Sequence, residues 1–264
     1  MGASYKRPPS PVTVAMLKGV IYGWTYSNNG ADAVNDIDIA AGGGADSTGA
    51  VFFSTGALTK QLDVAWAVGT NQGGRLGGVI ADTDYNIWAI YRGDTGAGEI
   101  AYEAVSASTP TLPASYTHYR KIGWFKRVAG TIVAFTTSEI AGGGIQLLWK
   151  APTLDVDLAN TLTTTRRTDA VKVPLQFAVD AILTLYVYDA TTSAYFLICC
   201  PDETDVAPSP TAARLATGQT VTANVWSGQI TVRTSAAGLI AARADLATVD
   251  TYRVSTNGFE WSRR

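Results

Sequence analysis

Short runs of β-branched and aromatic residues recur along the whole chain, and turn-forming residues separate them. Runs of this length predict β-strands, because a strand presents successive side chains to opposite faces. Turns or loops are predicted at Asn28-Asn29-Gly30, Gly42–Gly44, Gly142–Gly144 and Pro201–Pro210. The predicted strands are Val20–Tyr26, Ala50–Phe53, Tyr85–Tyr91, Ile100–Ala104, Tyr119–Arg127, Thr131–Thr136, Ile145–Lys150, Ala181–Tyr188, Ala194–Cys199, Gln229–Thr234, Gly238–Ala242 and Thr251–Thr256.

Many short strands at this spacing predict an all-β protein of the β-sandwich or jelly-roll-like kind. The composition agrees, since glycine and aromatic residues are plentiful while Glu and Lys, on which surface helices rely, are scarce. One segment favours a helix. In Gly56–Ala65, the apolar residues Leu58, Leu62 and Ala65 recur at i, i+4 and i+7, which predicts a short helix there.

The chain divides into three predicted parts. Residues 1–18 form an extended arm, because Tyr5–Pro11 reads YKRPPSP; the arm either docks into a neighbouring molecule or remains a disordered tail. Residues 19–160 form a β-sandwich module. The polar stretch Thr161–Val173 then marks a possible boundary, so that residues 161–264 are a second β module or a continuation of the same sandwich.

The charge balance limits the partners of the chain. Twenty basic and 22 acidic side chains give a net charge of −2, whereas nucleic acids and anionic membranes demand a basic face. No segment approaches the roughly 20 apolar residues that cross a bilayer, and the N-terminus lacks the apolar core of a secretion signal. We therefore expect no nucleic-acid partner and no membrane insertion.

The residue types that usually carry catalysis are isolated in this sequence. His118 is the single histidine, and no G-x-S-x-G motif is present. The glycine-rich segment Gln72–Gly78 lacks the Lys-Ser/Thr of a phosphate-binding loop, which favours a flexible turn. Cys199 and Cys200 are adjacent and are interpreted as free thiols, at least one of them in the core, and no zinc site is predicted. We expect a protein that is not an enzyme and has no cofactor.

Three Asp-x-Asp pairs are the remaining candidates for chemistry at paired carboxylates. Two carboxylates on one face of a strand could hold a calcium ion or serve as the acid pair of a glycoside hydrolase. The last two pairs are predicted in loops, where carboxylates are normally solvated. The pairs are Asp36/Asp38, Asp82/Asp84 and Asp155/Asp157.

Aromatic residues are the candidates for a binding surface, with seven Trp and 12 Tyr in the chain. Such rings stack on sugars or anchor protein interfaces. The alternative, which we favour for any single ring, is that they pack a β core or a subunit interface. The candidates are Trp24 and Tyr26, Trp88 and Tyr91, and Tyr186 and Tyr188.

Two stretches, residues 35–74 and 85–127, together resemble a recurrent module of tailed-bacteriophage and prophage virion proteins of the tail-fibre-like kind. The C-terminal end, from Ile230–Thr234 to Asn257–Trp261, is similar to the closing strands of such proteins. The points of resemblance are Ile37-Asp38-Ile39-Ala40, Ala45-Asp46-Ser47, Leu58–Lys60, Leu62-Asp63, Ala65–Gly69, Tyr85–Trp88, Arg92, Asp94-Thr95-Gly96, Leu112-Pro113 and Tyr119–Gly123.

The resemblance implies a compact β domain exposed on the virion exterior, on the tail or capsid surface, after assembly in the host cytoplasm. It implies a structural protein that contributes to host attachment, a homo-oligomer with a trimer favoured, and contact with other virion proteins through the N-terminal arm. A host-surface glycan or protein is the further partner to be expected. It implies no catalytic residues. A purely architectural capsid decoration or head spike, and a glycan depolymerase, remain the alternatives.

Overall fold

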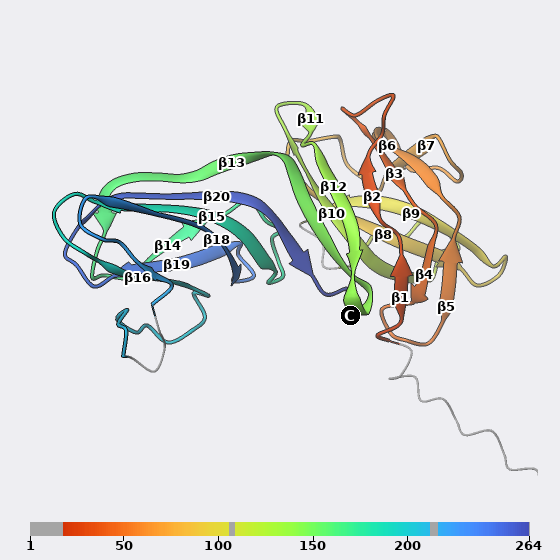
Figure 1. The fold of residues 1–264 in the computed structure, drawn as a ribbon. Coiled ribbons are helices and arrows are strands. Elements are labelled where there is room, and N and C mark those ends of the chain that lie inside the picture. Colours follow the sequence, from red (N-terminus) through yellow and green to blue (C-terminus); the bar gives the residue numbers. More distant parts are fainter. Residues whose placement is uncertain (1–17, 106–108, 212–215, 264) are drawn as a thin grey trace, which may run out of the picture.

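The computed structural model describes residues 18–105, 109–211 and 216–263, and in these residues the regular structure is β-strand apart from one 3₁₀ turn, η1 (Ala141–Gly143). The strands form four sheets in two lobes (Figure 1). The prediction of an all-β, sandwich-like protein is confirmed. The described residues contain no helix with the length and apolar character needed to span a membrane. The predicted arm lies outside the described residues except for Lys18.

The first lobe contains an eight-stranded sheet and a three-stranded sheet. In spatial order, the larger sheet consists of β11 (Thr131–Ile132), β10 (His118–Val128), β8 (Asp84–Arg92), β9 (Ala97–Ala104), β7 (Gln72–Arg75), β6 (Leu58–Ala65), β3 (Asp36–Ile39) and β2 (Tyr26–Asn28). The smaller sheet consists of β1 (Ile21–Gly23), β4 (Gly42–Ala45) and β5 (Phe52–Thr55).

A five-stranded sheet extends from the first lobe, where its edge strand β12 (Phe135–Ile140) lies, into the second lobe, which also contains a four-stranded sheet (Figure 1). The five-stranded sheet runs β12, β13 (Gly144–Leu162), β20 (Val249–Trp261), β15 (Asp180–Asp189) and β18 (Asn224–Arg233). The four-stranded sheet runs β14 (Arg167–Ala170), β19 (Leu239–Ala244), β16 (Tyr195–Cys199) and β17 (Gly218–Gln219). Their inner faces supply one apolar core, with Leu185 and Val254 from one sheet and Phe196 and Ile240 from the other.

The two lobes are joined by the long strands β13 and β20, which run side by side from one lobe into the other (Figure 1). Trp124 of β10 packs its ring 5.8 Å from that of Trp149 on β13 and 5.7 Å from that of Phe259 on β20, centroid to centroid. One buried cluster therefore continues across both lobes. Because β13 spans residues 144–162, its sheet contains strands from both sides of residue 161.

The predicted helix at Gly56–Ala65 is wrong, because this segment forms strand β6. Its inward positions are Lys60 and Leu62, which are both fully buried. A lysine at an inward position hides the two-residue alternation that would have indicated a strand. The same residues also fit the helical spacing, and pairing with β3 and β7 decides between the two structures.

Two glycine-rich segments predicted as turns are strands instead. Gly42–Gly44 lies in β4, and Gln72–Arg75 is β7, which pairs in parallel with β6 and β9. Glycine is required in β4 because a Cβ on Gly42 would lie 2.6 Å from Cγ of the Trp24 indole. Only the end of the second segment, Leu76–Gly78, leaves the sheet. The turns predicted at Gly142–Gly144 and Pro201–Pro210 are largely confirmed.

Candidate functional site

The three Asp-x-Asp pairs lie on or beside strands, and each carboxylate has partners of its own. In the first pair, Asp38 accepts hydrogen bonds from Asn29 Nδ2 at 2.8 Å and from Thr59 Oγ1 at 2.6 Å. Partial burial, together with the nearby Asp32 and Asp63, raises the pKa of Asp36 above its usual value. The described residues contain no group of three His, Cys, Asp or Glu side chains placed to hold a metal ion.

The prediction of solvated loop carboxylates holds for Asp82, which is exposed in the loop before β8, but it is wrong for Asp84 and for the strand location of the third pair. Asp84 begins β8 and is buried, with its Oδ1 2.8 Å from Lys126 Nζ. Asp82 accepts from Arg127 at 2.6 Å. The third pair lies within β13, where Asp155 Oδ2 accepts from the backbone N–H of Thr256 and Asp157 pairs with Arg253. These acids fasten neighbouring strands to one another.

His118 lies at the start of β10, with its Nδ1 3.0 Å from Asp46 Oδ2. The Asp46 carboxylate is buried and also accepts from the Thr48 hydroxyl and the Ala50 N–H. This contact holds the loop after β4 against β10, which agrees with the interpretation of His118 as a structural side chain.

The adjacent cysteines are both buried and free, in agreement with the interpretation of two free thiols. Cys199 ends β16, and the guanidinium of Arg166 donates to the backbone oxygen of Cys200 at 2.8 Å.

The candidate aromatic rings divide between core and surface. Trp24, Tyr26 and Trp88 are at most 3% exposed, which confirms the core alternative for these three. Tyr91 is half-buried and stacks on Phe53 at 5.2 Å. Tyr186 and Tyr188 are half-buried on β15.

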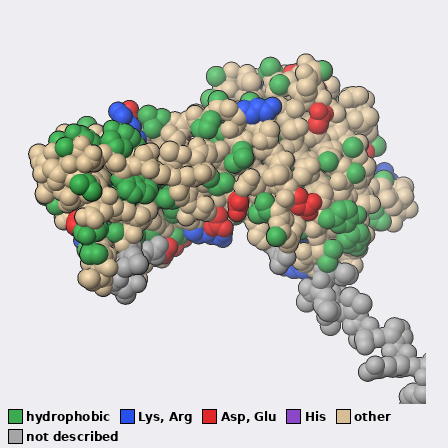
Figure 2. Space-filling view, in the orientation of Figure 1, with side chains coloured by type: hydrophobic (Ala, Val, Ile, Leu, Met, Phe, Trp, Pro, Cys, Tyr) green, Lys and Arg blue, Asp and Glu red, His purple; other side chains and the backbone are tan. Residues whose placement is uncertain are grey.

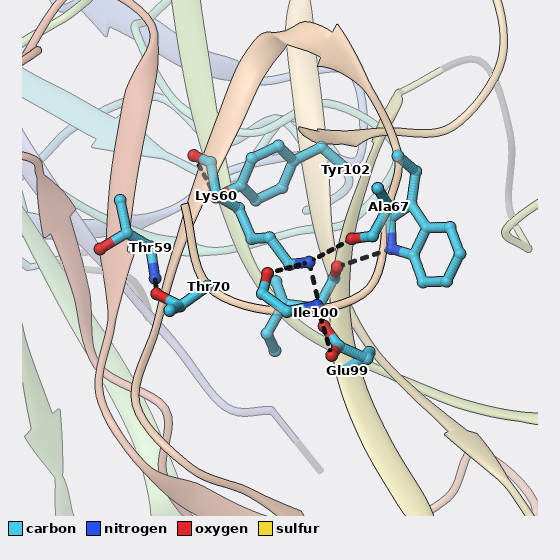
Figure 3. A network of polar contacts seen from close by, with 9 residues as sticks. Thr59, Lys60, Ala67, Thr70, Glu99, Ile100 and Tyr102 are labelled. Atoms are coloured by element: carbon cyan, nitrogen blue, oxygen red, sulfur yellow. Dashed lines mark hydrogen bonds and ion pairs between the residues drawn. The ribbon is translucent and has the colours of Figure 1, made fainter. Parts of the chain in front are cut away.

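A buried ion pair lies between β6 and β9 (Figure 3). Lys60 Nζ is 3.0 Å from Glu99 Oε2, and it donates to the backbone oxygens of Ala67 and Gly69 at 2.7 and 2.8 Å. Glu99 in turn accepts from the Gly69 N–H, and the Trp66 indole donates to the Ile100 oxygen. Burial lowers the pKa of Lys60, and Glu99 partly offsets that effect. The ammonium holds the chain that leaves β6, which is a structural role.

A different lysine faces an open pocket where the two lobes meet. We call it the Lys121 pocket; it has a volume of about 290 Å³ and is lined by Lys18, Ser47, Trp88, Tyr119, Arg120, Lys121, Trp261 and Arg263. These residues come from β8, β10, β20, the loop after β4, which contributes Ser47, and the two ends of the described chain. Four of the eight are basic and none is acidic.

Aromatic rings surround the amine of Lys121. Its Nζ lies 3.8 Å from the ring centroid of Phe177, 5.8 Å from that of Trp261 and 6.0 Å from that of Trp88. The pairing of β10 with β8 shifts register between Lys121 and Gly123, and such irregularities re-aim side chains and are frequent beside functional sites. Burial lowers the pKa of Lys121 to about 7.

Sequence reasoning singled out only Trp88 among the residues of this pocket as a site candidate. The others are contributed by segments that lie far apart in the chain, and no local motif joins them. The signal available was the adjacent pair Arg120-Lys121, which has no acidic neighbour in sequence.

No protein-family model matches the sequence, and no curated protein matches it. Among solved structures, a Bacillus thuringiensis Cry1Da tryptic core variant aligns with 90% of this chain and 51% of its own, with 8% sequence identity and a TM-score of 0.18. The chain thus spans about half the length of that protein. A similarity this weak carries no argument about function.

Proposed function

We propose that this chain is a non-enzymatic structural protein of a tailed-bacteriophage virion, exposed on the exterior of the tail, where it contributes to host attachment. The observation that carries the proposal is the resemblance of residues 35–127 to tail-fibre-like virion proteins. In the structure, this range covers seven strands of one lobe, β3 to β9, and nearly all of an eighth, β10. The resemblance therefore coincides with a coherent structural unit.

The physical character of the chain supports an exterior role. Only 16% of the residues are charged, and the face shown in Figure 2 carries few charged groups. Extensive strand pairing and a core continuous across both lobes favour a rigid body. Rigid β structure withstands proteolysis because local opening exposes cleavage sites only rarely.

An exposed apolar patch supports self-association. Val20, Tyr22 and Phe52 are 40%, 52% and 46% exposed, and the rings of Tyr22 and Phe52 stack at 6.4 Å on the outer face of the three-stranded sheet. Hydrophobic side chains gather over this part of the first lobe in Figure 2. Contiguous exposed apolar groups are typical of interaction surfaces. We infer self-association through this patch; the homotrimer, and the N-terminal arm as the attachment to other virion proteins, are what the resemblance implies.

Mass spectrometry of purified particles, after separation of heads from tails, tests the proposal. We expect peptides of this chain in the tail fraction. Peptides in the head fraction alone would instead favour a capsid decoration or head spike, and absence from particles would refute a virion role.

A further inference from the structure

The Lys121 pocket has an unbalanced charge. Among the described residues, no carboxylate lies within ion-pair distance of Lys121 Nζ, whereas Lys60 and Lys126 each have one. A half-buried amine without a counter-ion is costly, because burial disfavours the charged form. Asp46, which precedes Ser47 of the lining, is already held by His118 and the loop after β4. The described residues therefore supply no anion that balances the positive charge of Lys121 in this pocket.

The two arginines of the pocket do not compete for that anion. Arg120 donates to the backbone oxygens of Lys18 and Arg263. Arg263 donates to the backbone oxygens of Gly143 and Gly23 at 2.7 and 2.9 Å, and its guanidinium lies 3.6 Å from Glu139. The guanidinium groups of both arginines are therefore already hydrogen-bonded to backbone oxygens, and these bonds join the ends of the described chain to the lobes. Lys18, the fourth basic residue of the lining, is exposed, so the cationic group left inside the pocket is the ammonium of Lys121. One ammonium matches one negative charge rather than a bidentate phosphate site.

The rest of the lining is suited to a small ring that carries hydroxyl groups. Tyr119 and Trp261 are half-buried, so part of each ring faces the pocket. Rings of this kind pack against the apolar faces of sugars, while the hydroxyls of Ser47 and Tyr119 offer hydrogen bonds. The volume of about 290 Å³ is at the lower end for small-molecule sites. It suits one ring better than an extended chain.

We propose that the Lys121 pocket binds one carboxylated sugar ring of the hexuronic acid class, with its carboxylate against Lys121 Nζ and its ring between Tyr119 and Trp261. That this sugar belongs to a host-surface polysaccharide rests on the proposed function. The binding itself rests on the pocket alone. The lowered pKa of Lys121 agrees with this assignment, since a bound carboxylate would restore the charged amine that burial disfavours.

The test is a titration of the purified full chain with methyl glucuronide. Tryptophan fluorescence and saturation-transfer NMR detect the binding. Methyl glucoside is the matched ligand, because it has the same ring without the carboxylate. We expect glucuronide to bind at least about tenfold more tightly than glucoside, as a charge-assisted contact to a carboxylate requires. Equal binding of the two sugars, or no binding of either, would overturn the proposal.

Two variants assign the binding to this pocket. Lys121→Met keeps the apolar stem and removes the amine, so it should reduce glucuronide affinity to that of glucoside. Lys172→Met is the matched control. Lys172 Nζ also lies over a tryptophan ring, 4.8 Å from the Trp149 centroid, but Lys172 is outside the pocket. The affinity of the Lys172→Met variant for glucuronide should be unchanged. Retained affinity in Lys121→Met, with both variants folded by circular dichroism, would contradict the assignment.

Inorganic phosphate serves as a competitor. Weak displacement of glucuronide supports a sugar site, whereas displacement at equal concentration would show an unspecific anion site and would overturn the sugar assignment. These results are separable from the test of the virion role. A chain found in tails that fails to bind glucuronide loses only this inference, and a chain that binds glucuronide but is absent from particles loses only the proposed function.

Discussion

Among the described residues, three lysines lie against aromatic rings, and their surroundings differ in one respect. Lys60 lies 5.7 Å from the Trp66 centroid and is paired with Glu99. Lys172 lies over Trp149 and is stabilised electrostatically by Asp155. Aromatic rings surround the amine of Lys121, but no acidic side chain among the described residues pairs with it. At the scale of single residues, the presence of an acidic partner distinguishes the structural lysines from Lys121, the candidate binding group.

Replacing Lys60 by Met should destabilise the protein by about 3–5 kcal/mol, because it leaves Glu99 buried without its cation. Two backbone oxygens would also lose their donor. Urea unfolding measures the loss. Arg233→Met is the control, since Arg233 and Asp180 form a pair whose side chains are 53% and 46% exposed, and exposed pairs contribute little. Similar effects of the two substitutions would contradict a structural role for the buried pair.

Replacing Lys121 by Met should remove a pH dependence of stability. Below pH 7 the Lys121 amine is charged in both the folded and the unfolded protein. The full free-energy cost of burying this charge then lowers the stability of the folded protein. Between pH 7 and the usual lysine pKa of 10.5, the unfolded chain still binds a proton that the folded protein has released. The stability of the native protein should therefore rise with pH across this window.

The measurement is the difference in unfolding free energy between the native protein and Lys121→Met at several pH values from 6 to 10. Groups common to both proteins cancel in that difference. It should change in favour of the native protein by at most about 1.4 kcal/mol per pH unit above pH 7. A difference that stays flat across the window would show that the Lys121 amine remains charged in the folded state.

At the scale of elements, the strands that the sequence predicted well contain their own apolar signal. β8, β10, β15 and β16 are rich in β-branched and aromatic residues, so their strand propensity is visible locally. β4 has no such residue, because its sequence is Gly-Gly-Gly-Ala. Its core contact is supplied by the Trp24 ring from a distant segment, and a local pattern cannot contain that information.

Replacing Gly42 by Ala should destabilise the protein by about 1–3 kcal/mol, as overpacking of a tight contact does. The added Cβ would lie 2.4 Å from the backbone N and 2.6 Å from the ring Cγ of Trp24. Gly93→Ala is the control, because nothing lies within 4 Å of a Cβ there. Thermal unfolding of both variants provides the comparison, and an equal effect of the two substitutions would show that the contact with Trp24 does not require glycine.

The candidate pocket was less predictable than the strands. Ser47, Trp88, Lys121 and Trp261 are brought together by sheet pairing and by the return of β20 to the first lobe. The sequence contains many aromatic residues, but its composition does not indicate which of their rings surround an amine. The adjacent basic pair Arg120-Lys121 also gives no indication that one side chain is engaged by backbone oxygens while the other faces the pocket.

At the scale of the whole molecule, two β lobes share one continuous core, and the patch formed by Val20, Tyr22 and Phe52 remains exposed. If this patch mediates the proposed trimer, Tyr22→Ser combined with Phe52→Ser should convert trimers into monomers. Light scattering coupled to gel filtration measures the mass. Val79→Ser is the control, because Val79 is 85% exposed elsewhere on the surface. A native protein that is already monomeric would contradict the proposed assembly.

The most direct test of the central claim is immunogold electron microscopy of intact particles, with an antibody raised against the folded chain. An exterior tail protein predicts gold on the tails of undisrupted particles, and the label should disappear when free purified protein is added as a competitor. The absence of label from intact particles, or label that appears only after disruption, would contradict a role on the virion exterior.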